Sequence, residues 1–271
     1  VLGFTFMGIA VKYLPRIPTY EKVFFRNSVS LILSAFILFK QKESIKVEKE
    51  NIPFVFGRSF FGFVGMVANF YALEYLTMAE ANMLNKLSPV FVTICACMFL
   101  KERVDKKQVI GIILMLLAVV FVIKPSFSPE IIPSLAGLSS AVLAGFSYTI
   151  IRYLNGKVKS EINVLYFSLL SVVCTFPLMM MNFVKPTLSE FLILLGGIGI
   201  SAAIGQFGLT YAYTFAPASE VSIYNYVIII TSMLMDYILF STIPDLFSFI
   251  GGFIIISTAI YLYIHNKKKD N

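Results

Sequence analysis

Ten long apolar stretches, separated by short polar breaks, leave this sequence little choice of fold. They lie near 1–13, 20–39, 52–75, 79–100, 107–123, 134–154, 162–183, 190–213, 218–240 and 246–264. A membrane-spanning helix needs about 20 mainly apolar residues. Stretches such as 109–123 are apolar on every face, unlike the alternating strands of a membrane β-barrel. With 58% hydrophobic residues in 271, we expect an all-α integral membrane protein with ten transmembrane helices.

The basic residues are distributed unevenly among the polar breaks. Fourteen of the 22 Lys and Arg fall in four segments that ten crossings would place on one side of the membrane: 40–49, 101–107, 152–159 and 267–269. The opposite breaks carry five, namely Lys12, Arg16, Lys22, Lys124 and Lys185. Because cytoplasmic loops are enriched in Lys and Arg, we expect a multi-pass protein of the cell membrane with both termini in the cytoplasm. The net charge of +7 therefore indicates topology, and we expect no nucleic-acid partner.

Few residues suit catalysis or metal binding. The three cysteines lie inside apolar stretches without metal-site or disulfide spacing, and the sole histidine, His265, begins the basic tail. An intramembrane enzyme would need a nucleophile with a base, or a set of metal ligands. We expect a non-enzyme with no catalytic residues, no metal and no cofactor. The first stretch is short for a crossing and starts at Val1, so we expect further residues upstream; a cleaved signal peptide is the alternative.

The sequence contains an internal repeat with an offset of 140 residues. The matching pairs are Tyr71-Ala72 with Tyr211-Ala212, Gly57 with Gly197, Gly65 with Gly205, Glu80 with Glu220 and Asn85 with Asn225. Each half then holds five crossings, and because five is odd the second half is inverted in the membrane. Inverted repeats are typical of secondary transporters. We predict a first five-helix repeat over 1–125, a second, inverted one over 133–265 and a basic cytoplasmic tail over 266–271.

Polar side chains within the apolar stretches mark candidate binding positions, because a charge in the bilayer core usually faces a cavity or a partner. Lys86 lies roughly 12 Å below the outer end of its helix, which is deep for a side chain that reaches the surface. The predicted substrate-binding residues are Lys86, Arg58, Asn69, Asn85, Asn82, Tyr148, Gln206, Asn225 and Arg26.

Two stripes of small residues recur at helical spacing. The first consists of Arg58, Gly62, Gly65, Asn69 and Ala72, and the second of Gly197, Ser201, Gly205, Gly208 and Ala212, with Gln206 alongside. Such stripes fit the lining of a cavity and equally the close packing of membrane helices. Pro89, on the face of Lys86, removes a backbone hydrogen bond and predicts a kink or hinge.

Three acidic residues are candidates for proton coupling: Asp236, Glu80 and Glu220. Asp236 lies inside its stretch, where the alternative role is that of a counter-ion to Arg or Lys. Glu80 and Glu220 stand at predicted helix starts, where carboxylates also suit the helix dipole. Arg26 could instead pair with Glu21 or Glu80.

The segment from Arg58 to Ile123 resembles the first-half signature of EamA-type carriers of the drug/metabolite transporter superfamily. The matching features are Tyr71-Ala72 before a short turn, the small residues Ala79 and Ala81, the mid-helix Pro89 and Glu102 after the apolar run. The second half departs from this pattern, with Ile229 in place of the proline, Ser241-Thr242 near the acidic position and Pro244-Asp245 beyond it. The resemblance implies ten helices around a central cavity, and it is closest to a subgroup that includes S-adenosylmethionine carriers.

We therefore predict a secondary transporter that moves a small polar metabolite, zwitterionic or anionic, such as an amino acid or nucleoside-related compound, by alternating access. The excess of buried cations favours a carboxylate or phosphate on the substrate. The alternative is an exporter of drug-like organic cations, which 27 Phe and 14 Tyr could stack against. A channel or an intramembrane enzyme is a further alternative. The expected partners are a small-molecule substrate and the lipid bilayer, with a homodimer left open.

Overall fold

The computed structural model describes residues 1–100, 105–123, 131–215 and 218–270, which form helices and, within these ranges, no strand. Side chains are described for all of these except residues 96, 100, 213–215, 218–223 and 266–270. The helices are α1 (Leu2–Lys12), α2 (Thr19–Lys40), α3 (Ile52–Tyr75), α4 (Met78–Asn85), α5 (Ser88–Leu100), α6 (Lys106–Ile123), α7 (Ile131–Leu154), α8 (Ser160–Met181), α9 (Leu188–Leu192), the π-helix η1 (Ile193–Ile200), α10 (Ser201–Phe215), α11 (Ala218–Phe240) and α12 (Leu246–Asp270).

The helices suit a bilayer. Eight segments of the described chain are long and apolar enough to cross a membrane, and two shorter apolar helices, Leu2–Lys12 and Tyr224–Phe240, accompany them. Large apolar side chains cover the outer faces, with Phe39 and Phe253 exposed to 84% and 67%, while many polar side chains are buried within the bundle. The protein is therefore a multi-pass helical membrane protein, as the hydropathy pattern predicts.

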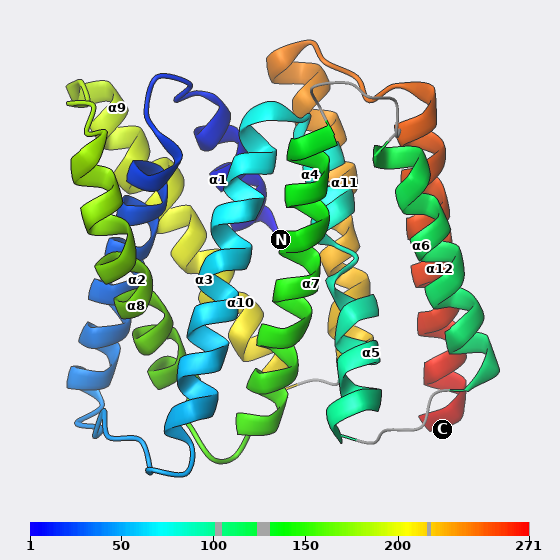
Figure 1. Ribbon diagram of the computed structural model, residues 1–271, viewed down its shortest axis with the longest axis horizontal. Coiled ribbons are helices and arrows are strands. Elements are labelled where there is room, and N and C mark those ends of the chain that lie inside the picture. The colour runs from blue at the N-terminus through cyan, green and yellow to red at the C-terminus, as the bar shows by residue number, and fades with distance from the viewer. Residues whose placement is uncertain (101–104, 124–130, 216–217, 271) are drawn as a thin grey trace.

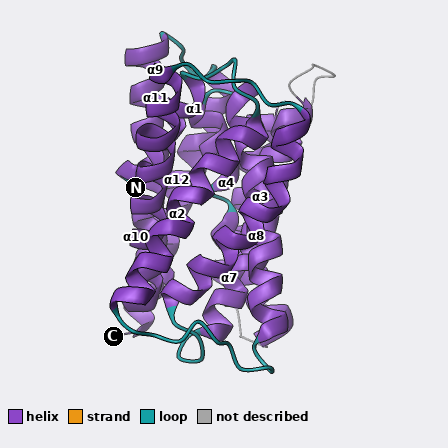
Figure 2. Ribbon diagram, turned by 90° about the vertical axis from the view of Figure 1, so that its left-hand side faces the viewer, coloured by secondary structure: helices purple, strands orange, loops and turns teal. Residues whose placement is uncertain are grey.

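The helices run between two ends of the bundle, where the loops gather (Figures 1 and 2). The 41–51 loop, the 155–159 turn, the start of α6 and the end of α12 all lie at the lower end in Figure 1. This is the basic end of the bundle, and the connections α1–α2, α8–α9 and α11–α12 form the far end. The basic segments thus lie together, and their placement in the cytoplasm stays a prediction.

The two predicted halves interleave. The helix α3 packs along α7 and α8, while α2 packs along α8 and η1, and α1 packs along η1 and α10. The pairs α4–α11 and α6–α12 also pack together, and α4 and α5 both contact α7. Each helix of the first half that contributes to the interior therefore has a neighbour from the second half.

The fourth stretch is interrupted in mid-bundle. The helix α4 ends at Asn85 and α5 begins at Ser88, which leaves Lys86 and Leu87 outside both helices; Figure 2 shows the short non-helical segment next to α4. Pro89 has no N–H to donate to the carbonyl of Asn85. The predicted kink or hinge is thus a break in the helix, with Lys86 as the C-cap residue of α4.

The eighth stretch contains the π-helical segment η1 between α9 and α10. Its backbone approaches α2 closely, because a Cβ added at Gly199 would lie 2.5 Å from Cγ2 of Val29. A π-helical turn inside a longer helix alters the faces presented before and after it.

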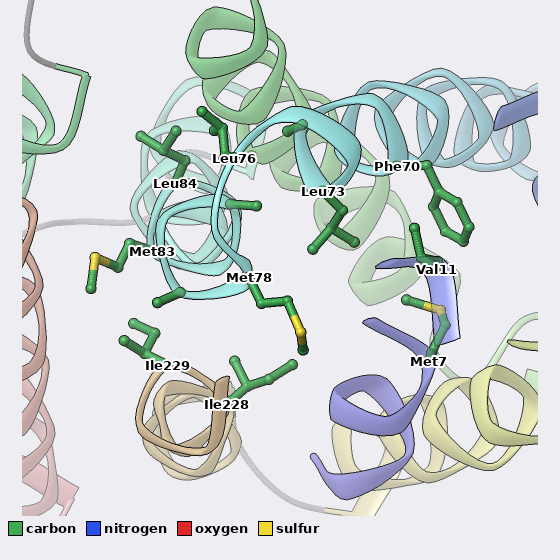
Figure 3. Close-up of a cluster of buried hydrophobic side chains, with 14 of the residues drawn as sticks. Met7, Val11, Phe70, Leu73, Leu76, Met78, Met83, Leu84, Ile228 and Ile229 are labelled. Carbon is green, nitrogen blue, oxygen red and sulfur yellow. The ribbon is translucent and has the colours of Figure 1, made fainter. Parts of the chain in front are cut away.

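A buried apolar cluster lies where α1, α3, α4 and α11 meet. Figure 3 shows side chains from these helices pointing into a common space, among them Val11, Leu73, Met78 and Ile228. Val11, Leu73 and Met78 are at most 2% exposed. The cluster includes the α3–α4 connection at Leu76 and so packs the interior toward the far end.

Candidate functional site

A cavity of about 100 Å³ lies inside the bundle, on the basic-end side of the apolar cluster. Residues of α1, α2, α3, α4, α7, α8, α10 and α11 line it, together with the α4–α5 break. Its polar lining residues are Arg26, Arg58, Asn69, Asn82, Asn85, Lys86, Ser140, Ser147, Tyr148 and Gln206. Three of these are cations, and the described lining contains no Asp or Glu.

Eight of the nine predicted substrate-binding residues line this one cavity. The exception is Asn225, which lies on α11 and is not among the lining residues. Whether the eight bind a substrate stays a prediction. The lining residues Phe4, Ser140, Ser147 and Phe167 were missed, because aromatic and small hydroxyl side chains are common in membrane helices and give no signal in a single sequence.

Arg58 is 2% exposed and lies at the part of the cavity nearer the basic end. Its Nε and Nη1 atoms have no hydrogen-bond partner among the described residues. The guanidinium carbon lies 4.2 Å from the ring centroid of Phe167, within cation–π range. Ser147 on α7 donates a hydrogen bond of 3.1 Å to the Arg58 carbonyl, which fixes the backbone of α3 at this level.

Arg26 on α2 approaches the same ring, with 5.5 Å between its guanidinium carbon and the Phe167 centroid. It donates hydrogen bonds of 2.8 Å to Asn27 and 3.2 Å to Gln206. The alternative pairing with Glu21 or Glu80 is wrong, since the described residues place no carboxylate within 4.0 Å of Arg26. Residues on the same face of a helix are three or four positions apart. Glu21 and Arg26 are five positions apart and therefore lie on different faces of α2.

Lys86 is partly buried at the α4–α5 break, with its Nζ atom 5.9 Å from the ring centroid of Phe4. No carboxylate of the described chain lies within 4.0 Å of this ammonium group. Beside it, Asn85 donates a 3.0 Å hydrogen bond to Ser140 on α7. The Oδ1 atom of Asn69, on α3, is buried without a hydrogen-bond partner in the described chain.

Asn82 differs from the other cavity amides because its NH₂ group is fully used. It donates to the Met78 carbonyl at 2.8 Å and to Ser232 of α11 at 2.9 Å. This side chain ties α4 to α11 across the two halves.

Asp236 and Glu80, two of the three acidic candidates, are not among the residues that line the cavity. Asp236 of α11 is fully buried, and its Oδ2 accepts a 2.8 Å hydrogen bond from the Ala79 N–H at the start of α4. No Lys or Arg of the described chain lies within 4.0 Å of it, although Lys12 interacts with it electrostatically from farther away. Asp236 therefore caps α4, and its role as a counter-ion stays a prediction. Glu80 forms a capping box with Thr77 and accepts a 2.7 Å bond from Ser248. The side chain of Glu220 lies outside the described residues.

The two small-residue stripes have different surroundings. In the first, Gly62 and Gly65 line the cavity, and a Cβ on Gly65 would also lie 3.0 Å from Leu143 of α7. In the second, Gln206 lines the cavity, while a Cβ added at Gly205 would lie 3.0 Å from the Phe4 ring of α1. The first stripe therefore serves lining and packing, and the second mainly packing.

Ion pairs that the hydropathy pattern did not predict join helices at the far end. Lys22 of α2 contacts Glu74 of α3 at 2.6 Å, and Thr19 donates to the other oxygen of that carboxylate at 2.5 Å. Arg16 pairs with Glu190, and this hydrogen bond raises the pKa of Arg16 above its ordinary value. These residues stand at predicted helix ends, where charges are ordinary and their partners cannot be read from one sequence.

The described chain contains no group of three or more His, Cys, Asp or Glu that could hold a metal ion. The described chain is a helical bundle with apolar outer faces and a polar cavity that contains three cations. This combination defines a polytopic membrane transporter.

Comparison with known proteins gives the family. The EamA-like transporter family matches residues 1–124. The pseudopaline exporter of Pseudomonas aeruginosa strain UCBPP-PA14 is 30% identical over 248 residues, which cover 91% of this chain and 86% of the exporter. The S-adenosylmethionine uptake transporter of Rickettsia conorii is 27% identical over 269 residues, 96% of this chain and 88% of that transporter. The chain belongs to the EamA-like transporter family.

The fold has a counterpart among solved structures. A crystal structure with 19% sequence identity superposes with a TM-score of 0.67 and covers 95% of this chain and 94% of its own. At this identity the likeness concerns the fold alone.

Proposed function

We propose that this protein is a secondary carrier of a small acidic or zwitterionic metabolite and that it works by alternating access. The observation that carries the proposal is the composition of the cavity lining. Its described residues include Arg26, Arg58 and Lys86 but no Asp or Glu. Taking a charge out of water costs several kcal/mol, and an uncompensated buried charge is strongly destabilising. An anionic group on the substrate would compensate charges that the described lining leaves unpaired.

Ten crossings in two inverted halves are part of this proposal. Exchanging the halves would turn the α3–α7 contact into the contact of α10 with α1, and would map α2–α8, α4–α11 and α6–α12 onto themselves. All of these contacts are present, which supports a two-fold relation between the halves. In such a fold, two inverted copies can exchange conformations around a fixed site.

The size of the cavity supports movement. A volume of about 100 Å³ is below the roughly 300 to 1,000 Å³ of pockets that hold drug-sized ligands. Toward the far end the apolar cluster and the Lys22–Glu74 pair close the interior. A metabolite would therefore enter only after helices of the two halves separate, alternately at the basic end and the far end.

The names of the two relatives support a small-molecule substrate and leave the direction open, because one is named for export and the other for uptake. The rival substrate class, drug-like organic cations, fits the lining less well. A cation would face three charges of its own sign without a described carboxylate to bind it.

Asp236 remains our candidate for proton coupling. Its Oδ1 atom is buried without a hydrogen-bond partner among the described residues, and its Oδ2 holds the start of α4. A proton on Asp236 would weaken its hold on the helix that carries Asn85 and leads to Lys86. Glu80 suits this role less well, because Thr77 and Ser248 engage both of its oxygens.

The substrate class can be tested on purified protein by thermal unfolding in the presence of carboxylates, amino acids, nucleotides and amines, since a ligand of the folded state raises the melting temperature. We expect acidic or zwitterionic compounds to stabilise the protein and to be transported into liposomes. Lys86→Met should abolish that stabilisation, whereas Lys46→Met, which removes a charge in the exposed 41–51 loop, should leave it unchanged. Stabilisation by amines alone would contradict the proposal.

Coupling is tested separately by measuring flux of a confirmed substrate with and without a pH gradient. We expect the gradient to drive flux in the wild type and to have no effect in Asp236→Asn. A gradient effect that survives in this variant would remove Asp236 from the coupling mechanism.

A further inference from the structure

Arg26 and Arg58 form one cationic subsite within the cavity. Their guanidinium groups face the same aromatic ring, Phe167, at 5.5 and 4.2 Å. Both side chains are at least nine-tenths buried, being 4% and 2% exposed. Arg58 Nε and Nη1 and Arg26 Nε are donors without a partner in the described chain. Guanidinium donors match a carboxylate in geometry and charge, so this subsite is built for an acidic group.

Lys86 forms a second, different subsite. Lys86 is the C-cap residue of α4, and its ammonium group lies 5.9 Å from the ring centroid of Phe4. Asn69 Oδ1, which also lines the cavity, is an acceptor without a partner among the described residues. The ammonium group of Lys86 can bind the carboxylate of an amino acid, and Asn69 Oδ1 can accept a hydrogen bond from its ammonium group.

The two subsites lie at different levels of the bundle, and α7 provides the scale. Asn85, next to Lys86, bonds to Ser140, whereas the Arg58 backbone bonds to Ser147. Seven residues of helix separate these two hydroxyls, which corresponds to about 10 Å. The Arg58 side chain extends about one turn along α3 toward Gly62, since a Cβ added at Gly62 would lie 3.3 Å from its Nη1. This shortens the distance to the level of Lys86. The spacing between the two cationic groups along the axis is therefore roughly 5 to 10 Å.

We infer that the substrate is an amino acid with a second acidic group, held with its amino-acid end at Lys86 and Asn69 and its second acid at Arg26 and Arg58. A single carboxylate would compensate one subsite and leave the other charged and unpaired, at the cost of burying an uncompensated ion. This inference rests on the proposed function and narrows its substrate class.

A ligand series on the wild-type protein tests the inference without any variant. The series consists of L-aspartate, L-glutamate, L-2-aminoadipate and L-2-aminopimelate, with L-glutamine and glutarate as single-change analogues. We expect at least one of the amino dicarboxylates to raise the melting temperature and to be transported. Glutamine lacks the second charge and glutarate lacks the amino group, so each should bind roughly 30-fold more weakly than glutamate if glutamate is the fitting length.

Variants assign the two groups to their subsites. Arg58→Gln should lower the affinity for the amino dicarboxylate of the fitting length by roughly 30-fold and should change the affinity for glutamine little. Lys86→Met should lower the affinity for the amino dicarboxylate and for glutamine, because both ligands carry the amino-acid carboxylate. Lys46→Met in the exposed loop is the matched control and should change neither.

The outcomes separate this inference from the proposed function. If singly charged acids are transported, bind as tightly as the amino dicarboxylates and lose the same affinity in Arg58→Gln, the inference is overturned while the carrier function stands. If no acidic or zwitterionic compound stabilises the wild type or crosses the liposome membrane, the proposed function fails and the inference with it. If Arg58→Gln does not fold, the comparison of glutamate with glutamine on the wild type still decides.

Discussion

At the scale of the residue, the cavity shows how this fold accommodates cations without acids. Arg58 has an aromatic ring at 4.2 Å, and Arg26 has amide oxygens of Asn27 and Gln206 at 2.8 and 3.2 Å. A cation–π contact at a desolvated site is worth about 2 kcal/mol, less than the cost of burying an ion. The remaining deficit favours an anionic ligand.

Arg58→Lys tests whether the guanidinium geometry or only the charge is needed. A lysine keeps the positive charge but loses the planar fork and its stacking on Phe167. We expect the variant to fold and to transport the substrate with an affinity lower by roughly tenfold, about 1.4 kcal/mol. Concentration-dependent flux in liposomes measures the change, and wild-type affinity in this variant would show that charge alone is recognised.

The residues of the candidate site were largely predictable, because a charge or amide inside an apolar helix stands out in the sequence. Arg26, Arg58 and Lys86 are of this kind. Their neighbours were not predictable: Phe167 is one of 27 phenylalanines, and nothing in the sequence marks it as the ring that two arginines approach. The contact of Arg26 with Gln206 joins positions 180 apart in the sequence, which helical periodicity cannot reveal.

At the scale of the element, the α4–α5 break is the feature that most affects the site. Hydropathy gives one continuous stretch, and Pro89 predicts a kink or hinge, whereas the structure leaves Lys86 and Leu87 outside both helices. Asp236 holds the start of this short helix and Lys86 caps its end. A displacement of α4 would therefore change the surroundings of both residues.

Pro89→Ala tests the role of the break. Alanine restores the N–H that could bond to the Asn85 carbonyl and extend the helix over Lys86. Because Pro89 lies in the first turn of α5, where proline is tolerated, we expect the free energy of unfolding to change by less than about 1 kcal/mol. Substrate flux should fall severalfold. Unchanged flux would show that the break is not needed for transport.

The Lys22–Glu74 pair at the far end is a second element-level contact with a measurable effect. Among the described residues, Lys22→Met would leave the Glu74 carboxylate with only Thr19 as a close partner at this largely buried position. We expect a loss of about 2 kcal/mol in the free energy of unfolding, and a smaller loss in the double variant Lys22→Met with Glu74→Gln. Denaturant unfolding in detergent gives both values; equal losses would mean that the pair is not coupled.

The contact between α6 and α12 should depend on pH. The Gln108 backbone N–H and then His265, 2.6 Å from the carboxylate, hold the pKa of Asp105 below its ordinary value. A depressed folded-state pKa stabilises the protein above the unfolded-state pKa, and this contribution disappears as the pH falls through the folded-state value. Asp105→Asn should therefore lower the melting temperature at pH 7, and this difference should shrink as the pH falls below the ordinary pKa of an aspartate. A difference that persists at acid pH would contradict this assignment.

At the scale of the whole molecule, hydropathy correctly predicted a multi-pass helical membrane protein, because lipid demands long apolar segments with satisfied backbones. How the helices pack was beyond the sequence alone, since contacts such as α3–α7 and α1–α10 depend on surfaces distant in the chain. The π-helical segment η1 was not predicted either, because its glycine-rich sequence is also compatible with an ordinary α-helix. The close approach of Gly199 to α2 becomes evident only in the structure.

The orientation in the membrane is open to a direct test. In a background with Cys95, Cys97 and Cys174 replaced by Ala, single cysteines at Lys46 and Asn182 would report the basic and far ends, because both positions are exposed. We expect a membrane-impermeant thiol reagent added to intact cells to label Asn182→Cys and to label Lys46→Cys only after lysis. Labelling of Lys46→Cys in intact cells would reverse the predicted topology.

The interleaving of the two halves also bears on how the protein is made. Arg26 and Arg58 are synthesised and inserted well before Phe167 and Gln206, the ring and the amide that accompany them in the finished bundle. During that interval two guanidinium groups lie in helices whose later neighbours have not yet left the ribosome. An arginine at the bilayer centre costs about 2.5 to 3.5 kcal/mol on insertion scales, so we expect these helices to settle in the lipid more readily once the second half has been inserted.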